Sequence, residues 1–188
     1  MFLEQIKALP KKVIENMDGD LKNLKIYLVQ DYDLKFLQQM VNFSQDIFGD
    51  SSLDEWGMVP QIRQGNVFVL KEEGARKLSG LAILMRGWED KESAYLFDFA
   101  ISEEHQGQGL GFHFLKGIIE NLIDQGFQRM SLTVNTENHG AIHLYKDKLG
   151  FRTLERKDHE YGQGEHRYIM ELDFQQFLED KAAGKFRL

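Results

Sequence analysis

The stretch that decides the fold is His105-Gln106-Gly107-Gln108-Gly109-Leu110-Gly111-Phe112, in which glycine occupies every second position from 107 to 111. It follows a strand-like apolar run and precedes a run with helical spacing, so we expect a turn between a strand and a helix. Glycine lets such a turn bend tightly and places no Cβ between the backbone and a ligand. The N–H groups that open the helix point outward, and the helix dipole adds positive potential. The stretch therefore predicts an anion site, best suited to phosphate.

The two common nucleotide-binding glycine motifs do not fit this stretch. The dinucleotide motif G-x-G-x-x-G would need glycine at Phe112 or, counted from Gly109, at Phe114, and the Gly-Lys-Ser/Thr ending of the P-loop is absent. Both motifs follow the first strand of a β-α-β unit, whereas this stretch follows the fourth expected strand. A flexible turn without a ligand and a nucleotide-binding module of another kind stay open as alternatives.

Hydrophobic spacing predicts the elements on either side of the turn. Strands are expected at 24–29, 66–72, 78–88, 94–102, 129–134, 152–157 and 167–172. Helices are expected at 34–48 with Asp31 or Asp33 as the cap, at 53–63, from Phe114 to a stop at Gly126, and at 141–149. This order predicts the α/β class: a mixed sheet with helices on both faces, in which a three-stranded meander leads into a β-α-β crossover.

The organisation expected is one domain over residues 23–172. Residues 1–22 are expected to form an N-terminal helical extension, because apolar residues recur there at helical spacing and Asp18-Gly19-Asp20 ends the pattern. A dimer contact or a lid is the alternative reading of that helix. Residues 173–188 are expected to be a partly helical C-terminal tail. The first residues include Glu4 and no long apolar core, so no signal peptide is expected.

Composition narrows the class of protein. The 188 residues carry 23 Lys and Arg against 30 Asp and Glu, a formal net charge of −7, which argues against a protein that mainly binds nucleic acid. There is no cysteine, so disulfides, zinc-thiolate sites and cysteine nucleophiles are excluded. No window approaches the length of a membrane span. We therefore expect a cytoplasmic protein with no nucleic-acid or membrane partner.

Two motifs resemble those of the GNAT superfamily of N-acetyltransferases. Gln106-x-x-Gly109-x-Gly111 is similar to the family signature Q/R-x-x-G-x-G/A, and the lead-in 99–104 is similar to the strand before it, with Glu103 where a proline is frequent. Downstream, Asn138-x-x-Ala141-x-x-Leu144-Tyr145, followed by Gly150-Phe151, is similar to the second family motif. The spacing from Tyr145 to Gly150 is one residue longer than usual. The resemblance covers about residues 23–172.

The resemblance implies the GNAT fold, with a mostly antiparallel central sheet and a splayed parallel strand pair that binds acetyl-CoA. It implies that acetyl-CoA is the co-substrate, that no metal takes part, and that the acceptor is a primary amine on a small molecule or on a protein or peptide. Many relatives are dimers, so it also allows a homodimer. Carried over onto this sequence, the residues that contact acetyl-CoA are Phe99, Ala100, Ile101, Gln106, Gly107, Gln108, Gly109, Leu110, Gly111, Phe112, Asn138 and Tyr145.

The reaction implied is direct attack of the amine on the thioester, which requires one group to remove a proton from the ammonium and another to protonate the thiolate. The tyrosine of the second motif is the usual general acid, which assigns that role to Tyr145. Relatives carry a carboxylate base on the fourth strand, on the face where this chain has Tyr95, whereas Asp98 lies on the other face by strand alternation. Both are candidates for the base, and a water-mediated route needs neither. Tyr145, Tyr95 and Asp98 could also be ordinary structural residues.

Further features concern the acceptor and the alternatives. Asp50, Asp54, Glu55 and Glu160 could form a negative mouth that attracts a cationic amine, or could be solvated acids. The segment 160–170 is similar to a region of protein N-terminal acetyltransferases that shapes the acceptor site, although several of its residues depart from that pattern. His139 and His143 have a metal-compatible spacing, but exposed helix histidines are the simpler reading. A non-catalytic acyl-CoA-binding or sensor domain on the same fold is the alternative to an enzyme.

Overall fold

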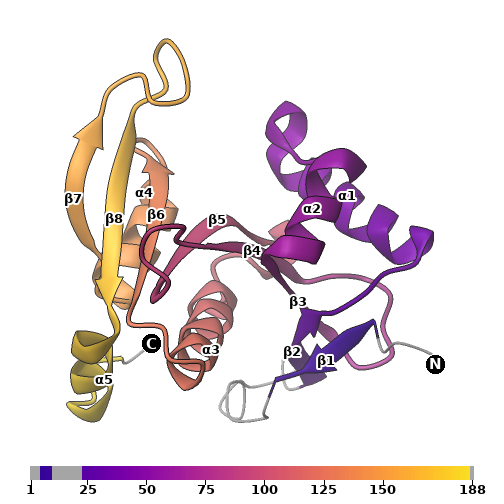
Figure 1. Ribbon diagram of the computed structural model, residues 1–188, viewed down its shortest axis with the longest axis horizontal. Coiled ribbons are helices and arrows are strands. Elements are labelled where there is room, and N and C mark those ends of the chain that lie inside the picture. Colours follow the sequence, from indigo (N-terminus) through magenta and orange to yellow (C-terminus); the bar gives the residue numbers. More distant parts are fainter. Residues whose placement is uncertain (1–4, 10–22, 187–188) are drawn as a thin grey trace. The chain divides into compact units, whose positions relative to one another are not determined.

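The computed structural model describes residues 5–9 and 23–186 (Figure 1). Its strands are β1 (Ile6–Ala8), β2 (Leu24–Val29), β3 (Asn66–Glu72), β4 (Gly80–Arg86), β5 (Ser93–Ile101), β6 (Arg129–Asn135), β7 (Arg152–Lys157) and β8 (Arg167–Asp173). Its helices are α1 (Leu34–Phe48), α2 (Glu55–Gln64), α3 (Leu110–Asp124), α4 (His139–Ile142), which continues into a π-helical segment (His143–Lys148), and α5 (Phe174–Ala182). Short 3₁₀ turns lie at Gly49–Ser51 and Glu103–His105.

Within the described residues the strands form one mixed sheet of eight, in the order β1-β2-β3-β4-β5-β6-β8-β7. β5 and β6 are parallel, as expected for two strands joined by the α3 crossover. The chain divides into two compact units: a first unit of Met1–Met85 with Asp98–Ile118, and a second unit of Arg86–Phe97 with Ile119–Leu188. Each unit is described by itself below.

The first unit is an antiparallel set of strands whose core is shared with α1 and α2. β2 pairs with β3, and β3 pairs with β4 through the hairpin around Gly74. α1 begins where Asp33 caps it, because the Asp33 carboxylate accepts a hydrogen bond from the N–H of Phe36 at 2.8 Å. A cluster of buried side chains joins these elements: Tyr27, Val29, Phe36, Leu37, Met40, Val41, Met58, Ile62, Val67, Val69, Leu78, Leu81 and Ile83. This unit carries the predicted glycine turn.

The expectation of a helix at the N-terminus is wrong for Ile6–Ala8, which form strand β1. β1 pairs with β2 in antiparallel register, from Ile6 opposite Val29 to Ala8 opposite Tyr27. The N–H of Leu9 also donates to the carbonyl of Ile26 at 2.9 Å. The edge of β2 offers unpaired backbone groups, and pairing with them outweighs the helical spacing of the apolar residues. Residues 1–4 and 10–22 of the expected helix lie outside the described residues.

The second unit is built on β6, β8 and β7. β6 and β8 pair over seven residues, from Arg129 opposite Asp173 to Asn135 opposite Arg167. β7 pairs with β8 along the sheet edge, with a register shift between Thr153 and Glu155. The C-terminal tail is helical, as expected, over α5. Asp173 caps that helix by accepting from the N–H of Gln176 at 3.0 Å.

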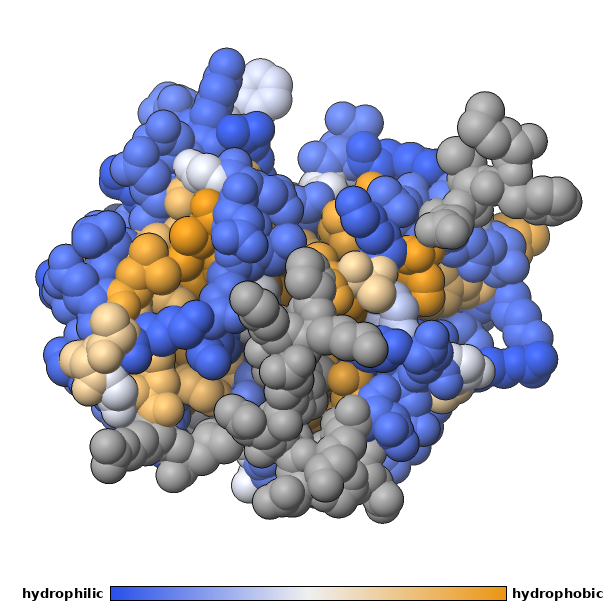
Figure 2. Space-filling model, turned by 90° about the horizontal axis from the view of Figure 1, so that it is seen from below, coloured by the Kyte–Doolittle hydropathy of each residue, from blue (hydrophilic) through white to orange (hydrophobic). Residues whose placement is uncertain are grey.

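On the face shown in Figure 2, hydrophilic side chains surround hydrophobic ones. Among the described residues, no helix has the length and hydrophobicity needed to cross a membrane.

Candidate active site

The glycine turn joins β5 to α3, as the sequence predicts. Gly107 and Gly109 have φ angles of +75° and +78°, a left-handed conformation that other residues rarely adopt. A Cβ on Gly107 would have no atom within 4 Å, so the backbone there faces open space. The N–H of His113 donates to the carbonyl of Gly109 at 3.2 Å. The first N–H groups of an α-helix have no carbonyl one turn earlier within the helix, so the start of α3 is a place where an anion can bind.

Side-chain amides hold the turn in shape. The Gln106 amide donates to the carbonyl of Ile101 at 3.0 Å, and the Gln108 amide donates to the carbonyl of Glu104 at 2.8 Å. The hydroxyl of the buried Ser102 lies 2.8 Å from Nδ1 of His105. The Gln106 contact ties the turn to the end of β5, and the other two contacts hold the segment between the strand and the turn. The glutamine of the signature is therefore a brace for the backbone, since its own amide group is used within the turn.

β5 supplies the two candidate bases, and their environments differ. Asp98 is half-buried, between the buried Leu96 and Ala100 that share its face of the strand. Burial raises the pKa of the Asp98 carboxyl to about 7, although a hydrogen bond from the N–H of Phe99 lowers it. A carboxyl with a pKa near 7 can accept a proton at neutral pH and release it again, which is what a general base needs.

Tyr95 belongs to a cluster of three hydroxyl groups in the second unit. Its hydroxyl lies 3.1 Å from that of Thr133 and 3.4 Å from that of Tyr161, and the last two lie 3.1 Å apart. Burial raises the pKa of Tyr95 to about 12. Tyr95 is therefore neutral at pH 7, so it can donate or accept a hydrogen bond but is poorly suited to act as a base. Thr133 was not among the residues singled out from the sequence. The signal for it was its position on β6 between Leu132 and Val134, which places its side chain on the opposite face of the strand from theirs.

The loop between β7 and β8 (Figure 1) carries Tyr161, which joins this hydroxyl cluster. The guanidinium of Arg167 lies over the ring of Tyr161, 4.7 Å from its centroid, and also donates to Glu165 at 3.0 Å. Glu165 in turn accepts from the Asn135 amide at 3.3 Å. From the sequence, this segment could be either a loop that shapes the acceptor site or a simple polar hairpin. Its contacts fix Tyr161 beside Tyr95.

The helix that carries Tyr145 contains a π-turn, which accounts for the extra residue before Gly150. Asn138 begins the helix, since its side-chain oxygen accepts from the N–H of Ala141 at 3.1 Å. Further along, the N–H of Leu149 donates to the carbonyl of Leu144, five residues earlier, at 3.1 Å. A π-turn of this kind absorbs one added residue and is frequent at functional sites. Tyr145 is buried, with its ring centroid 5.6 Å from that of Phe151.

Two other sets of predicted residues have structural partners. His143 pairs with Asp147, with 2.8 Å between Nδ1 and the carboxylate. In the part of the chain that the structure describes, no group of three or more His, Cys, Asp or Glu side chains could hold a metal ion. Asp54 caps α2 by accepting from the N–H of Gly57 at 2.9 Å. Asp54, which was expected to help attract a cationic amine, therefore has a structural role as the cap of α2.

Comparison with known proteins identifies the family. The model of the acetyltransferase (GNAT) family matches residues 34–151. Over 60 residues, 32% of the chain, the sequence is 38% identical to a thialysine N-epsilon-acetyltransferase of Sus scrofa and to a [ribosomal protein bS18]-alanine N-acetyltransferase of Escherichia coli K12. These matches span only 35% and 40% of the lengths of those relatives.

The fold agrees with these matches. The crystal structure of the ribosomal-protein-S18-alanine N-acetyltransferase from Escherichia coli superposes with a TM-score of 0.65 at 25% identity, and covers 79% of this chain and 94% of that one. The matched family segment includes α1, the glycine turn and the Tyr145 helix, so it contains both motifs that the sequence offered. The chain belongs to the acetyltransferase (GNAT) family.

Proposed function

We propose that this protein is an N-acetyltransferase that transfers the acetyl group of acetyl-CoA directly to a primary amine. The observation that carries the proposal is the glycine turn, with Gly107 and Gly109 in the left-handed conformation at the start of α3. Such a turn fits a pyrophosphate, because its backbone N–H groups and the helix dipole act on an anion without any cationic side chain. That suits a chain whose net charge is −7.

The backbone from Gln106 to Phe112 would hold the pyrophosphate, and the backbone of Phe99, Ala100 and Ile101 would pair with the pantetheine arm. In support, β5 pairs with β6 from Ser93 opposite Arg129 to Leu96 opposite Leu132, while β5 continues to Ile101. The later residues of β5 are therefore the ones that could offer backbone groups to a ligand. Asn138 would act mainly by capping the helix of Tyr145, since its side-chain oxygen is used there.

In the reaction, the Asp98 carboxylate takes a proton from the substrate ammonium, directly or through water. The freed amine attacks the carbonyl carbon of the thioester, the carbon–sulfur bond breaks, and the departing thiolate takes a proton from the hydroxyl of Tyr145. The nitrogen, still carrying one proton more than the amide, gives it up to restore the tyrosine hydroxyl, directly or through water. Asp98 is favoured over Tyr95 as the base because its pKa of about 7 matches neutral pH, whereas that of Tyr95 is about 12. The chain has no cysteine, so the acetyl group would pass without an acetyl-cysteine intermediate.

The acceptor is proposed as a primary amine on a small molecule or on a protein or peptide. The relatives named above act, by their names, on thialysine and on an alanine of a ribosomal protein, which are amines of both kinds. Exposed acids at Asp50 and Glu55 support a cationic acceptor, since they raise its local concentration. A cytoplasmic location and a homodimer stay predictions from the sequence.

An acetyl-CoA turnover screen tests this proposal. Release of free CoA thiol is measured with polyamines, amino acids, aminoglycosides and peptides with free N-termini, and Tyr145→Phe serves as the variant control. We expect turnover with at least one amine and a decrease in kcat of roughly 10²-fold or more in the variant. Tight CoA binding with no turnover on any amine would instead favour a sensor domain.

A further inference from the structure

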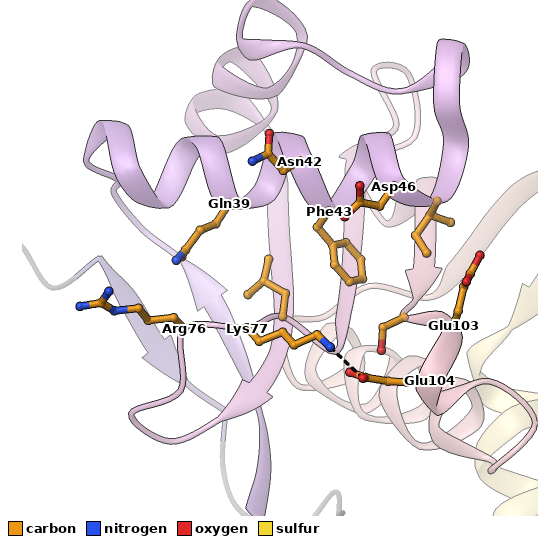
Figure 3. A pocket seen from close by; sticks show the side chains of 11 residues that line it. Gln39, Asn42, Phe43, Asp46, Arg76, Lys77, Glu103 and Glu104 are labelled. Carbon is orange, nitrogen blue, oxygen red and sulfur yellow. Dashed lines mark hydrogen bonds and ion pairs between the residues drawn. The ribbon is translucent and has the colours of Figure 1, made fainter.

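The first unit contains a pocket of about 710 Å³ whose lining includes none of residues 105–112 and none of the proposed catalytic residues. Two of its lining residues, Ser102 and Glu104, hydrogen-bond to the glycine turn. This volume is in the range of sites that hold small ligands. One wall is a stripe of α1 at helical spacing, formed by Gln39, Asn42, Phe43, Asp46 and Ile47 (Figure 3). The opposite wall comes from the residues just before β4 and from those just after β5. A core-facing stripe would be apolar, but this one carries an acid and two amides.

Charged side chains lie at opposite ends of this pocket. Figure 3 shows Arg76 at one end, and Asp46 and Glu103 toward the other. Lys77 and Glu104 neutralise each other, with 2.7 Å between their charged groups. Within residues 5–9 and 23–186, the charged groups of Arg76, Asp46 and Glu103 form no ion pair or side-chain hydrogen bond. The charges left for a ligand are therefore the guanidinium of Arg76 at one end and the carboxylates of Asp46 and Glu103 toward the other end.

The middle of the pocket combines amide and apolar groups. The Gln39 side chain has no partner among the described residues, and the Asn42 oxygen accepts from Gln38 at 2.9 Å, which leaves the Asn42 NH₂ group able to donate. Phe43 is half-buried and Leu78 is buried, so both add an apolar surface beneath these amides. Amide groups hydrogen-bond well to peptide groups, which carry one donor and one acceptor each.

We propose that this pocket binds a short free peptide in its zwitterionic form. The carboxylate of the peptide would lie at Arg76, and its ammonium between Asp46 and Glu103. Its backbone would lie along Gln39 and Asn42. A diamine would place one of its ammonium groups against the guanidinium of Arg76, so a diamine is disfavoured as the ligand. A dicarboxylate would place one of its carboxylates against Asp46 and Glu103, so it is disfavoured too. The site is separate from acetyl transfer and does not depend on the proposed function.

Isothermal titration of the full chain with trialanine tests the proposal, in the absence of acetyl-CoA so that no acetyl transfer can occur. N-acetyl-trialanine lacks the ammonium and trialanine amide lacks the carboxylate, so each removes one charge from the same peptide. We expect each capped peptide to bind at least about fivefold more weakly than trialanine, as for a partly exposed charge pair. Absence of trialanine binding, or equal binding of the three peptides, would overturn the proposal.

Variants then locate the binding site. Arg76→Gln should abolish the preference for the free carboxylate but keep that for the free ammonium. Asp46→Asn combined with Glu103→Gln should do the reverse. Lys91→Gln and Asp124→Asn remove exposed charges elsewhere and should leave all affinities unchanged. If the pocket variants bind the three peptides as the original chain does, the peptide binds at another site, an acceptor site included, and the proposal is wrong.

Discussion

Asp98 and Tyr95 lie three residues apart on one strand, and burial raises the pKa of both, with different consequences. A carboxyl raised to about 7 changes protonation state near neutral pH, whereas a phenol raised to about 12 stays protonated. The sequence named both as candidate bases but could not separate them, because burial depends on the packing of the whole strand. The environment of each side chain therefore favours Asp98.

Replacing Asp98 by asparagine tests its role as the base. The base acts in its ionised form, so kcat/KM of the unmodified chain should rise with pH through about 7. Asp98→Asn should lower kcat/KM by roughly 10²- to 10⁴-fold and abolish this rise. Steady-state rates across pH 5.5–9 would check it. A variant that keeps the same pH profile would show that another group is the base.

The same substitution has a consequence for stability that does not depend on activity. The pKa of the Asp98 carboxyl is near its ordinary value of 3.8 in the unfolded chain and about 7 in the folded chain, so between these pH values the folded chain binds more protons. The contribution of Asp98 to the free energy of unfolding therefore falls as pH rises across that window and is constant above it. Relative to the original chain, Asp98→Asn should gain stability from pH 4 to pH 7 in urea unfolding. A pH-independent difference would contradict the raised pKa.

Tyr161 connects the β7–β8 loop to the hydroxyl cluster. Tyr161→Phe removes the hydroxyl that lies 3.1 Å from Thr133 and 3.4 Å from Tyr95, and keeps the ring under Arg167. We expect a loss of about 0.5–1 kcal/mol in the free energy of unfolding, the usual value of one partly exposed hydrogen bond. Tyr168→Phe is the matched control on β8, and urea unfolding of both measures the difference. Equal losses would show that the cluster does not hold the loop.

Among the elements, the helix after β6 shows how sequence spacing and structure relate. The sequence placed Tyr145 but left the end of its helix uncertain, since one residue more than usual precedes Gly150. The structure resolves this with a π-turn after the cap at Asn138. The position of Tyr145 on the helix is set by its distance along the chain from the cap at Asn138. The added residue lies in the last turn of the helix, so it need not move Tyr145.

A pair of deletions tests this reading of the helix. Removing Lys146 should convert the π-turn into an ordinary turn, leave Tyr145 in place and keep kcat within about threefold of the original. Removing Gly140, which lies between the cap and Tyr145, should rotate Tyr145 by about 100° and abolish turnover, because each residue of a helix turns by that angle. Circular dichroism would check folding of both. Equal loss of activity would show that the cap does not set the position of Tyr145.

The strands and helices within 23–172 were largely predictable because their apolar spacing is regular. The glycine turn was predictable too, since Gly107 and Gly109 take the left-handed conformation that makes glycine necessary there. Strand β1 was not predictable, and a helix was expected in its place. A three-residue strand has too few residues to show a period, and it forms only because the edge of β2 is free to pair with it. The hydroxyl cluster was also missed, since Tyr95, Thr133 and Tyr161 come from three separate elements.

For the molecule as a whole, the net charge of −7 should affect how acceptors bind. If the acidic surface attracts cationic amines, kcat/KM should fall as salt screens it, with a Debye length of about 30 Å at 0.01 M and about 3 Å at 1 M. The decrease should be steeper for an acceptor with several ammonium groups than for one with a single group. Rates at several salt concentrations would check this, and an equal salt dependence would contradict it.

The central claim is that the turn from Gln106 to Gly111 holds CoA. The measurement is CoA affinity by isothermal titration for Gly109→Val and for the matched control Gly74→Val. The two glycines have φ angles of +78° and +76°, so each substitution costs roughly 1–2 kcal/mol or more in backbone strain, at two different places. We predict that Gly109→Val abolishes CoA binding while Gly74→Val, with a similarly lowered melting temperature, keeps it. Unchanged CoA affinity in a folded Gly109→Val protein would contradict the account.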